Sequence, residues 1–261
     1  MKKLLFILSI CGILLANDKI IKIGVTPYPT GDIVGNVKDL VEKEGFKLEI
    51  IEFDSYIIPN HAVNDGELDA NFTQNRQTLR VFNEEFKTDL IDAGTIFIGP
   101  IAGYSKKIKN IKDLPQNAVI YISSEPISCT RALDLLAENK IISFPKHLKN
   151  KQKTILDISE NPLNVKIKEI ESAQLIRVLD ECDLAIVDTN YALVAGLNPM
   201  KDSIIHEDTN SDYVCVLAVK KENESSAKTK ALLKAMQSKK MREYLNTHFK
   251  DVLIPSFKEE L

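Results

Sequence analysis

The 261-residue chain is slightly acidic, with 34 Lys and Arg against 37 Asp and Glu and a formal net charge of −3. Hydrophobic residues make up 44% of the chain, which suffices for one large domain or two smaller domains with buried cores. The charge balance argues against a nucleic-acid partner, because proteins bind the phosphate backbone mainly through an excess of Lys and Arg. We therefore expect a folded protein with a small ligand.

The first 16 residues have the pattern of a signal peptide. Lys2 and Lys3 precede an apolar run over residues 4–16, which is too short to span a bilayer. Cleavage after Ala16 and lipid modification at Cys11 are both compatible with the pattern. Ile10 is bulky where a lipoprotein signal prefers a small residue, so we favour cleavage after Ala16 and keep anchoring through Cys11 as the alternative. Either scheme predicts export to the periplasm.

Cleavage after Ala16 would leave three cysteines, Cys129, Cys182 and Cys215. An odd number in an oxidising compartment does not indicate a disulfide framework, and the spacing matches no metal site. We expect buried free thiols that behave as small apolar side chains, with one disulfide as the alternative.

From residue 19 onward, apolar strand-like runs alternate with helical patterns, which is typical of an open α/β sheet. The first half ends in an apolar run over residues 90–102 that Gly99 and Pro100 interrupt, and we interpret this run as a crossover between two lobes. The expected strands before it cover residues 20–25, 48–53 and 68–72, and the expected helices 32–44, 59–65 and 75–86.

A second α/β series follows and repeats the first. Its expected strands cover residues 119–122, 165–170 and 184–187, its helices 129–138 and 172–179, and a return strand at 213–219 precedes a long amphipathic helix at 225–249. The simplest architecture is two α/β lobes joined by two crossover strands. We place lobe I at residues 17–100 and 203–261, and lobe II at residues 101–202, with the ligand expected between them at the carboxyl ends of strands.

No motif of a catalytic site or nucleotide-binding loop occurs in the chain. The Gly-rich dinucleotide and phosphate loops, the zinc-protease His pair and the Gly-x-Ser-x-Gly nucleophile turn are all missing from the sequence. The four histidines lie among polar neighbours, as surface histidines do. We therefore predict a binding protein without catalytic residues, cofactor or metal.

Nine short segments, in order along the chain, resemble the NlpA-type lipoproteins, whose best-known members bind methionine for an ABC importer. The resemblance implies a type II periplasmic binding fold, which closes on its ligand, and a membrane partner made of a permease and an ATPase. The segments are Gly24-Val25-Thr26-Pro27, Asp69-Ala70-Asn71, Pro100 to Lys107, Arg131-Ala132-Leu133, Asp157-Ile158, Glu160-Asn161-Pro162, Ala173-Gln174-Leu175, Thr189-Asn190-Tyr191-Ala192 and Ala195-Gly196-Leu197-Asn198-Pro199.

The resemblance predicts a small amino-acid-type ligand: methionine, a related amino acid or a dipeptide. A polar zwitterion other than methionine is one alternative. The same fold also serves cofactor-biosynthetic enzymes, but an intracellular enzyme would not carry a signal peptide. We expect a monomer without nucleic-acid partners.

Two charged residues are the main candidates for the polar end of the ligand. Arg131 matches the family arginine that pairs with the α-carboxylate, and its planar fork can hold a carboxylate through two bonds. The alternative for Arg131 is a surface ion pair. Asp188 stands where the family usually has asparagine and would suit an ammonium group, although it could instead cap the helix that begins near Thr189. Ser128, close to Arg131, replaces a usual asparagine.

Three further candidates follow from the same resemblance. Tyr56 matches a tyrosine that lines the mouth of the pocket, Asn190 lies two residues after Asp188 in a matching segment, and Cys215 replaces another asparagine. Tyr56 has a second interpretation as a packing residue.

The side-chain pocket differs most from the family pattern. Thr73, Asn75 and Thr78 occupy places where the family has an aromatic residue, a histidine and a tyrosine around the thioether. Thioethers favour aromatic and apolar walls, so three polar replacements should weaken the preference for methionine. They could also mark a site that has lost ligand binding.

Overall fold

The computed structural model describes residues 19–149, 151–208, 212–250 and 252–258, which form two compact units. The first unit spans Met1–Ile98, Asp212–His248 and Pro255–Leu261, and the second spans Gly99–Ser211 and Phe249–Ile254, as far as these ranges are described. The predicted signal peptide and Cys11 lie outside the described residues.

The first unit is built on a mixed six-stranded sheet in the order β11-β4-β10-β3-β1-β2. β1 pairs in parallel with β2 and β3, and β10 runs antiparallel to β3 and β4. The strands are β1 (Ile20–Val25), β2 (Lys47–Glu52), β3 (Ala70–Phe72), β4 (Leu90–Ile98), β10 (Cys215–Lys220) and β11 (Ile254–Pro255). The helices are α2 (Asp32–Asn36), α3 (Lys38–Lys43), α4 (Ile58–Asp65), α5 (Arg76–Phe86), α8 (Ala227–Met236) and α9 (Lys239–His248).

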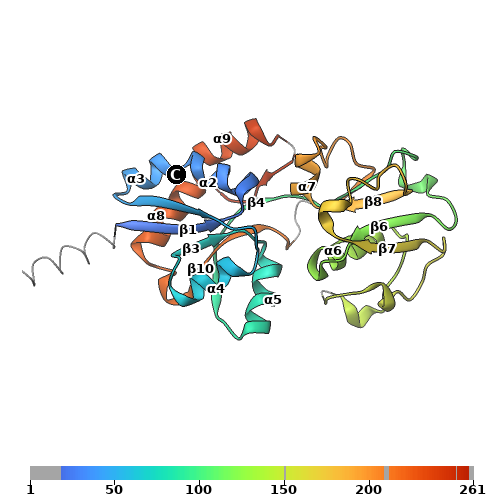
Figure 1. Cartoon of the computed structure of the whole chain (residues 1–261), viewed down its shortest axis with the longest axis horizontal. Coiled ribbons are helices and arrows are strands. Elements are labelled where there is room, and N and C mark those ends of the chain that lie inside the picture. Colours follow the sequence, from blue (N-terminus) through green and yellow to red (C-terminus); the bar gives the residue numbers. More distant parts are fainter. Residues whose placement is uncertain (1–18, 150, 209–211, 251, 259–261) are drawn as a thin grey trace, which may run out of the picture. The chain divides into compact units, whose positions relative to one another are not determined.

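Helices cover both faces of this sheet. Figure 1 shows α2, α3, α8 and α9 on one face and α4 and α5 on the other. The inner strands are therefore buried on both sides: four consecutive residues of β10, Val216, Leu217, Ala218 and Val219, are fully buried. Continuous apolar strands of this kind are expected where helices pack on both faces.

The second unit contains a five-stranded sheet in the order β7-β6-β8-β5-β9. Alternate residues of β8 point to opposite faces, where Leu184 and Ile186 pack with α6 and Ala185 and Val187 pack on the α7 side. The strands are β5 (Ala102–Tyr104), β6 (Val119–Ser123), β7 (Lys166–Ile170), β8 (Leu184–Val187) and β9 (Ile205–His206), and the helices are α6 (Pro126–Glu138) and α7 (Thr189–Val194).

The predicted fold class, two α/β units, is confirmed, but the expected division of the chain differs in places. Residues 203–208, expected in lobe I, belong to the second unit because β9 pairs with β5. The segment Phe249–Ile254 also belongs to the second unit. Three helices differ as well. The helix expected at 32–44 is split into α2 and α3, and the long one expected at 225–249 is split into α8 and α9. The helix expected at 172–179 is a 3-10 turn at Ser172–Gln174.

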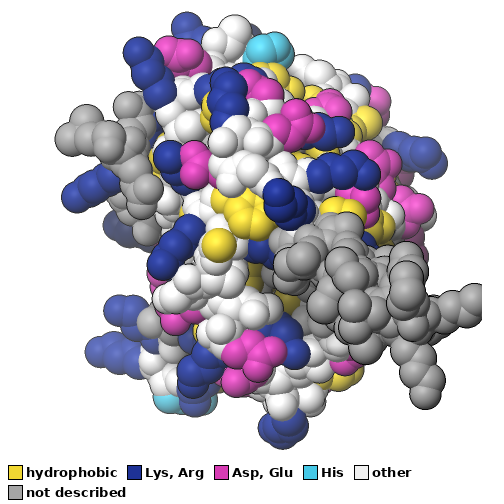
Figure 2. Space-filling view, turned by 90° about the vertical axis from the view of Figure 1, so that its left-hand side faces the viewer, with side chains coloured by type: hydrophobic (Ala, Val, Ile, Leu, Met, Phe, Trp, Pro, Cys, Tyr) yellow, Lys and Arg dark blue, Asp and Glu magenta, His cyan; other side chains and the backbone are white. Residues whose placement is uncertain are grey.

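Charged side chains of both signs are interspersed on the face of the first unit shown in Figure 2. Exposed ion pairs join α3 to α9, through Lys240 and Asp39, and the turn after α3 to α8, through Glu44 and Lys234. Such exposed pairs contribute little to stability. No helix in the described part of the chain is long and apolar enough to cross a membrane.

Candidate functional site

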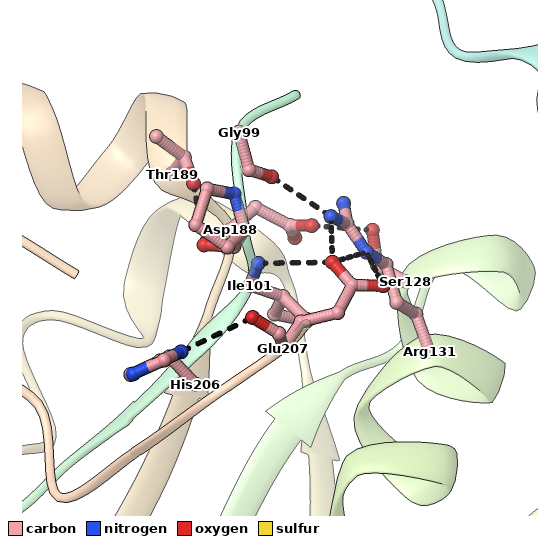
Figure 3. A network of polar contacts seen from close by, with 9 residues as sticks. Gly99, Ile101, Ser128, Arg131, Asp188, Thr189, His206 and Glu207 are labelled. Carbon is pink, nitrogen blue, oxygen red and sulfur yellow. Dashed lines mark hydrogen bonds and ion pairs between the residues drawn. The ribbon is translucent and has the colours of Figure 1, made fainter. Parts of the chain in front are cut away.

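Arg131 is buried in α6 and forms an ion pair with Glu207, just after β9. Only 8% of Arg131 and 7% of Glu207 are exposed. Arg131 Nε donates to Glu207 Oε1 at 3.1 Å and to Oε2 at 2.9 Å, and Arg131 NH2 also donates to Oε2 (Figure 3). Two carboxylate oxygens are thus held by one planar guanidinium, so the alternative of a surface ion pair for Arg131 is wrong.

The backbone of the segment before β5 forms hydrogen bonds with both residues of this ion pair. Arg131 NH2 donates to the carbonyl oxygen of Gly99 at 2.8 Å, and the backbone N–H of Ile101 donates to Glu207 Oε2 at 3.4 Å. A Cβ on Gly99 would lie 3.1 Å from Thr189 Cβ, which is tighter than an ordinary contact. Thr189 also donates its hydroxyl to the carbonyl of Pro100 at 2.7 Å. The start of α7 therefore fixes the backbone that holds Arg131.

Asp188 occupies the N-cap position directly before α7 without using its side chain as a cap. Its backbone is extended, at φ −66° and ψ 144°, and the carboxylate makes no capping bond to the helix. Instead, Ser128 Oγ donates to Asp188 Oδ1 at 3.1 Å, and the Asp188 carboxylate points towards Arg131 (Figure 3). The alternative of capping alone is therefore wrong, and Asp188 and Ser128 lie together with Arg131 as the resemblance implies.

Burial raises the pKa of Asp188 above its usual value, although the positive charge of Arg131 and the hydrogen bond from Ser128 act in the opposite direction. The negative charge of Glu207 adds to the increase. A desolvated carboxylate of this kind gains from a cationic partner, because the partner compensates for the lost water. Asp188 is thus suited to accept a hydrogen bond from an ammonium group.

Removing Arg131 should destabilise the protein, since Glu207 would remain as a buried carboxylate without its guanidinium. We expect Arg131→Ala to lower the free energy of unfolding by about 3–5 kcal/mol, and the double variant Arg131→Ala/Glu207→Ala to recover part of this loss. Urea denaturation measures both. The exposed pair Lys234 and Glu44 is the control, where alanine changes should cost less than about 1 kcal/mol. An Arg131→Ala variant as stable as the parent would contradict the buried pair.

Asp188→Asn should stabilise the protein at neutral pH. Because the pKa of Asp188 is raised in the folded protein, the folded state binds a proton more tightly than the unfolded chain, whose reference value is 3.8. The parent therefore loses stability as pH rises through the folded pKa, whereas the asparagine variant has no charge to bury. We expect the variant to be more stable at neutral pH and the difference to vanish in strong acid. Thermal unfolding over a pH series tests this, and a variant less stable than the parent at neutral pH would contradict it.

In the first unit, Asn75 and Thr78 satisfy each other. Asn75 caps α5: its Oδ1 accepts from the backbone N–H of Thr78 at 2.9 Å and from the Thr78 hydroxyl at 3.1 Å. The sequence suggested that both side chains would face the ligand as unpaired polar groups. Because they bond each other, neither needs a polar group from the ligand. Thr73 differs, because its buried hydroxyl has no hydrogen-bond partner among the described residues.

A network of buried amides lies beside Thr73. Gln74 Nε2 and Asn71 Nδ2 both donate to Asn60 Oδ1, at 2.6 and 2.7 Å, and Asn60 Nδ2 donates to Gln74 Oε1 at 2.7 Å. All three residues are at most 5% exposed. The network ties α4 to the end of β3, and it fixes the backbone that carries Thr73.

The remaining candidates are placed by the structure as follows. Tyr56 is 39% exposed in the loop between β2 and α4, Cys215 is half-buried at the start of β10 opposite Asn75, and Asn190 is half-buried in the first turn of α7. Whether they contact a ligand stays a prediction.

Sequence reasoning missed Glu207. A buried arginine requires a carboxylate, but the sequence offers 37 acidic residues and does not indicate which of them folds against α6. One available signal was the short apolar segment Ile204-Ile205, which could form an edge strand and which His206 separates from Glu207.

The cysteines are free thiols. Cys129 and Cys182 are buried, Cys215 is half-buried, and no disulfide joins these three residues. Burial raises the pKa of Cys129 to about 12, helped by the hydrogen bond to Glu169. Cys129 is thus an unreactive thiol at neutral pH. No group of His, Cys, Asp and Glu suited to a metal ion occurs in the described ranges.

The fold and the buried site define the class of the protein: its two α/β units have the architecture of periplasmic substrate-binding proteins. The sequence matches the NlpA lipoprotein family over residues 21–257. The chain therefore belongs to the NlpA lipoprotein family, and the resemblance seen in the sequence is confirmed.

Several known proteins are similar over most of their length. Lipoprotein 28 of Escherichia coli strain K12 is 37% identical over 260 residues, which cover 96% of this chain and 95% of the relative. A probable D-methionine-binding lipoprotein MetQ of Haemophilus influenzae is 35% identical and covers 90% of this chain and 86% of its own length. A nutrient binding protein from Burkholderia cenocepacia, solved bound to methionine, is 38% identical, with a TM-score of 0.84 and coverage of 91% of this chain and 100% of that structure.

Membership of a lipoprotein family confirms the prediction of an exported protein. Lipid modification of Cys11, the alternative to cleavage after Ala16, lies outside the described residues and stays a prediction.

Proposed function

We propose that this chain is the solute-binding component of an ABC importer, and that it captures methionine or a closely related α-amino acid or dipeptide and delivers it to the permease. The observation that carries this proposal is the group of the buried residues Arg131 and Glu207 with the half-buried Asp188 beside them. α6 follows β6 and Asp188 follows β8, so both side chains lie at the carboxyl ends of parallel strands, where ligands of α/β folds bind.

The two ends of an amino acid match this group. A carboxylate can accept charge-assisted hydrogen bonds from the Arg131 guanidinium, and an ammonium group can donate to the desolvated Asp188 carboxylate. Ser128 holds Asp188 in position through the hydrogen bond to Oδ1. None of these groups has to react, so the proposed activity is binding without catalysis.

The similar proteins support the same ligand class. The Haemophilus relative is named for D-methionine, and the Burkholderia structure contains methionine. We propose that the ligand also contacts the first unit, through Thr73 and Tyr56, with further contacts from Asn75 and Thr78 of the first unit and from Asn190 of the second. A ligand that binds both units favours a closed form by its difference in affinity between the closed and open forms, and the permease would recognise the closed form.

A polar zwitterion is the second candidate, because one observation favours it. The buried Thr73 hydroxyl has no partner among the described residues, and a polar ligand side chain would provide one. An unpaired buried hydroxyl costs about 1–3 kcal/mol, so such a ligand would gain affinity over methionine.

Calorimetry against the free amino acids in both enantiomers, and against methionine dipeptides, tests the proposal. We expect at least one α-amino acid of the methionine type to bind, and Arg131→Lys to weaken its binding by about tenfold or more. Lysine keeps the positive charge next to Glu207 but lacks the planar fork, and a charge-assisted bond is worth about 1.5–3 kcal/mol. Folded, ligand-free protein that binds nothing in this panel would contradict the proposal.

Thr73→Val separates the two ligand candidates. Valine removes the unpaired hydroxyl at nearly constant shape, so we expect the free energy of unfolding to rise by about 1 kcal/mol and methionine affinity to stay equal or to increase. Denaturation and calorimetry on the same variant give both values. If the best ligand of the parent binds tenfold more weakly to the variant, the hydroxyl serves that ligand, and the polar zwitterion is the correct candidate.

A further inference from the structure

Among Arg131, Glu207 and Asp188, the carboxylates outnumber the guanidinium by two to one (Figure 3). One guanidinium faces two carboxylates, Glu207 through its paired hydrogen bonds and Asp188 as the carboxylate held by Ser128. With both carboxylates ionised, the three side chains have a net charge of −1. A site built to attract a carboxylate by charge alone would have the opposite sign.

Glu207 is also fixed in place. It is 7% exposed, both of its carboxylate oxygens accept from Arg131, and Oε2 accepts in addition from the N–H of Ile101. It therefore stays beside Arg131 when a ligand arrives, and a ligand carboxylate shares the guanidinium with Glu207.

We infer that Glu207 is a selectivity residue, which makes binding of a carboxylate depend on an ammonium group in the same ligand. This inference rests on the proposed function and deepens it. A ligand carboxylate alone would bring a third negative charge next to the Arg131 guanidinium, and charges of like sign repel strongly where little water screens them. An α-ammonium group supplies the missing positive charge next to Asp188, so a zwitterion enters without adding net charge.

The selectivity comes from a residue whose role differs from that of Arg131 or Asp188. Arg131 provides the donors and Asp188 the acceptor, whereas Glu207 sets the number of negative charges before any ligand binds. Replacing its carboxylate by an amide should therefore change which ligands are accepted, beyond any general weakening of the site.

The test compares methionine with its α-hydroxy acid, in which a hydroxyl group replaces the ammonium group and the rest of the molecule is unchanged. We expect the parent to bind the hydroxy acid at least a hundredfold more weakly than methionine. In Glu207→Gln we expect this ratio to shrink by about tenfold or more. If the role of Glu207 were only structural, Glu207→Gln would bind both ligands more weakly by the same factor, and the ratio of the two affinities would stay unchanged.

Two control variants accompany the test. Glu207→Asp keeps the charge and should keep the parent's ratio. Glu181→Gln removes one negative charge from an exposed position of the second unit, and it should leave the ratio unaltered if the effect is local. Circular dichroism and thermal unfolding check that each variant is folded, and a parent without a preference for methionine overturns the inference even if Glu207→Gln does not fold.

The outcomes distinguish this inference from the proposed function. Two results would overturn the inference and leave the proposed function intact. In the first, folded Glu207→Gln binds methionine with the parent's ratio of affinities. In the second, the parent binds the hydroxy acid as tightly as methionine. A parent that binds no amino acid would overturn both.

Discussion

A buried arginine must be neutralised, and in this protein the neutralising carboxylate comes from 76 residues along the chain. Arg131 lies in the helix after β6 and Glu207 directly after the edge strand β9, so the pair forms only when the sheet of the second unit is complete. Neighbouring backbone groups bond to both partners of the pair. The carbonyl oxygen of Gly99 accepts a hydrogen bond from the Arg131 guanidinium, and the N–H of Ile101 donates one to the Glu207 carboxylate. Breaking such a pair costs far more than an exposed ion pair, because either partner alone would be a desolvated charge.

In the proposed function, the same pair explains how a site for a ligand carboxylate avoids binding every anion. A lone buried arginine would attract any small anion, whereas we infer that one already paired with Glu207 accepts a carboxylate only where a second cation offsets the added charge. Asp188 supplies the place for that cation, and burial holds its pKa above the usual range, so it gains most from a positive partner. In the proposed function, Asp188 is the residue that makes an ammonium group in the ligand necessary.

Local pattern predicted much of the fold, and the errors have physical causes. The strands at 20–25 and 184–187 were predicted at their observed bounds because continuous apolar runs between turn residues are a strong signal. The assignment of residues 203–208 failed because pairing of the short strand β9 depends on a distant partner, which periodicity does not show. In the candidate site, Arg131 could be identified from its match to the family, but Glu207 could not, since a long-range ion pair leaves no local pattern. The mutual bonding of Asn75 and Thr78 was also missed, although an asparagine three residues before a threonine is compatible with a helix cap.

Native mass spectrometry of the protein, purified without refolding and then mixed with an equimolar set of amino acids and their α-hydroxy acids, tests the central claim most directly. The account predicts a bound mass that matches an α-amino acid of the methionine type, with the corresponding hydroxy acid left unbound. Retention of the hydroxy acid in comparable amount, or of a small anion without an ammonium group, would show that the buried pair of Arg131 and Glu207 does not govern which ligands the protein accepts.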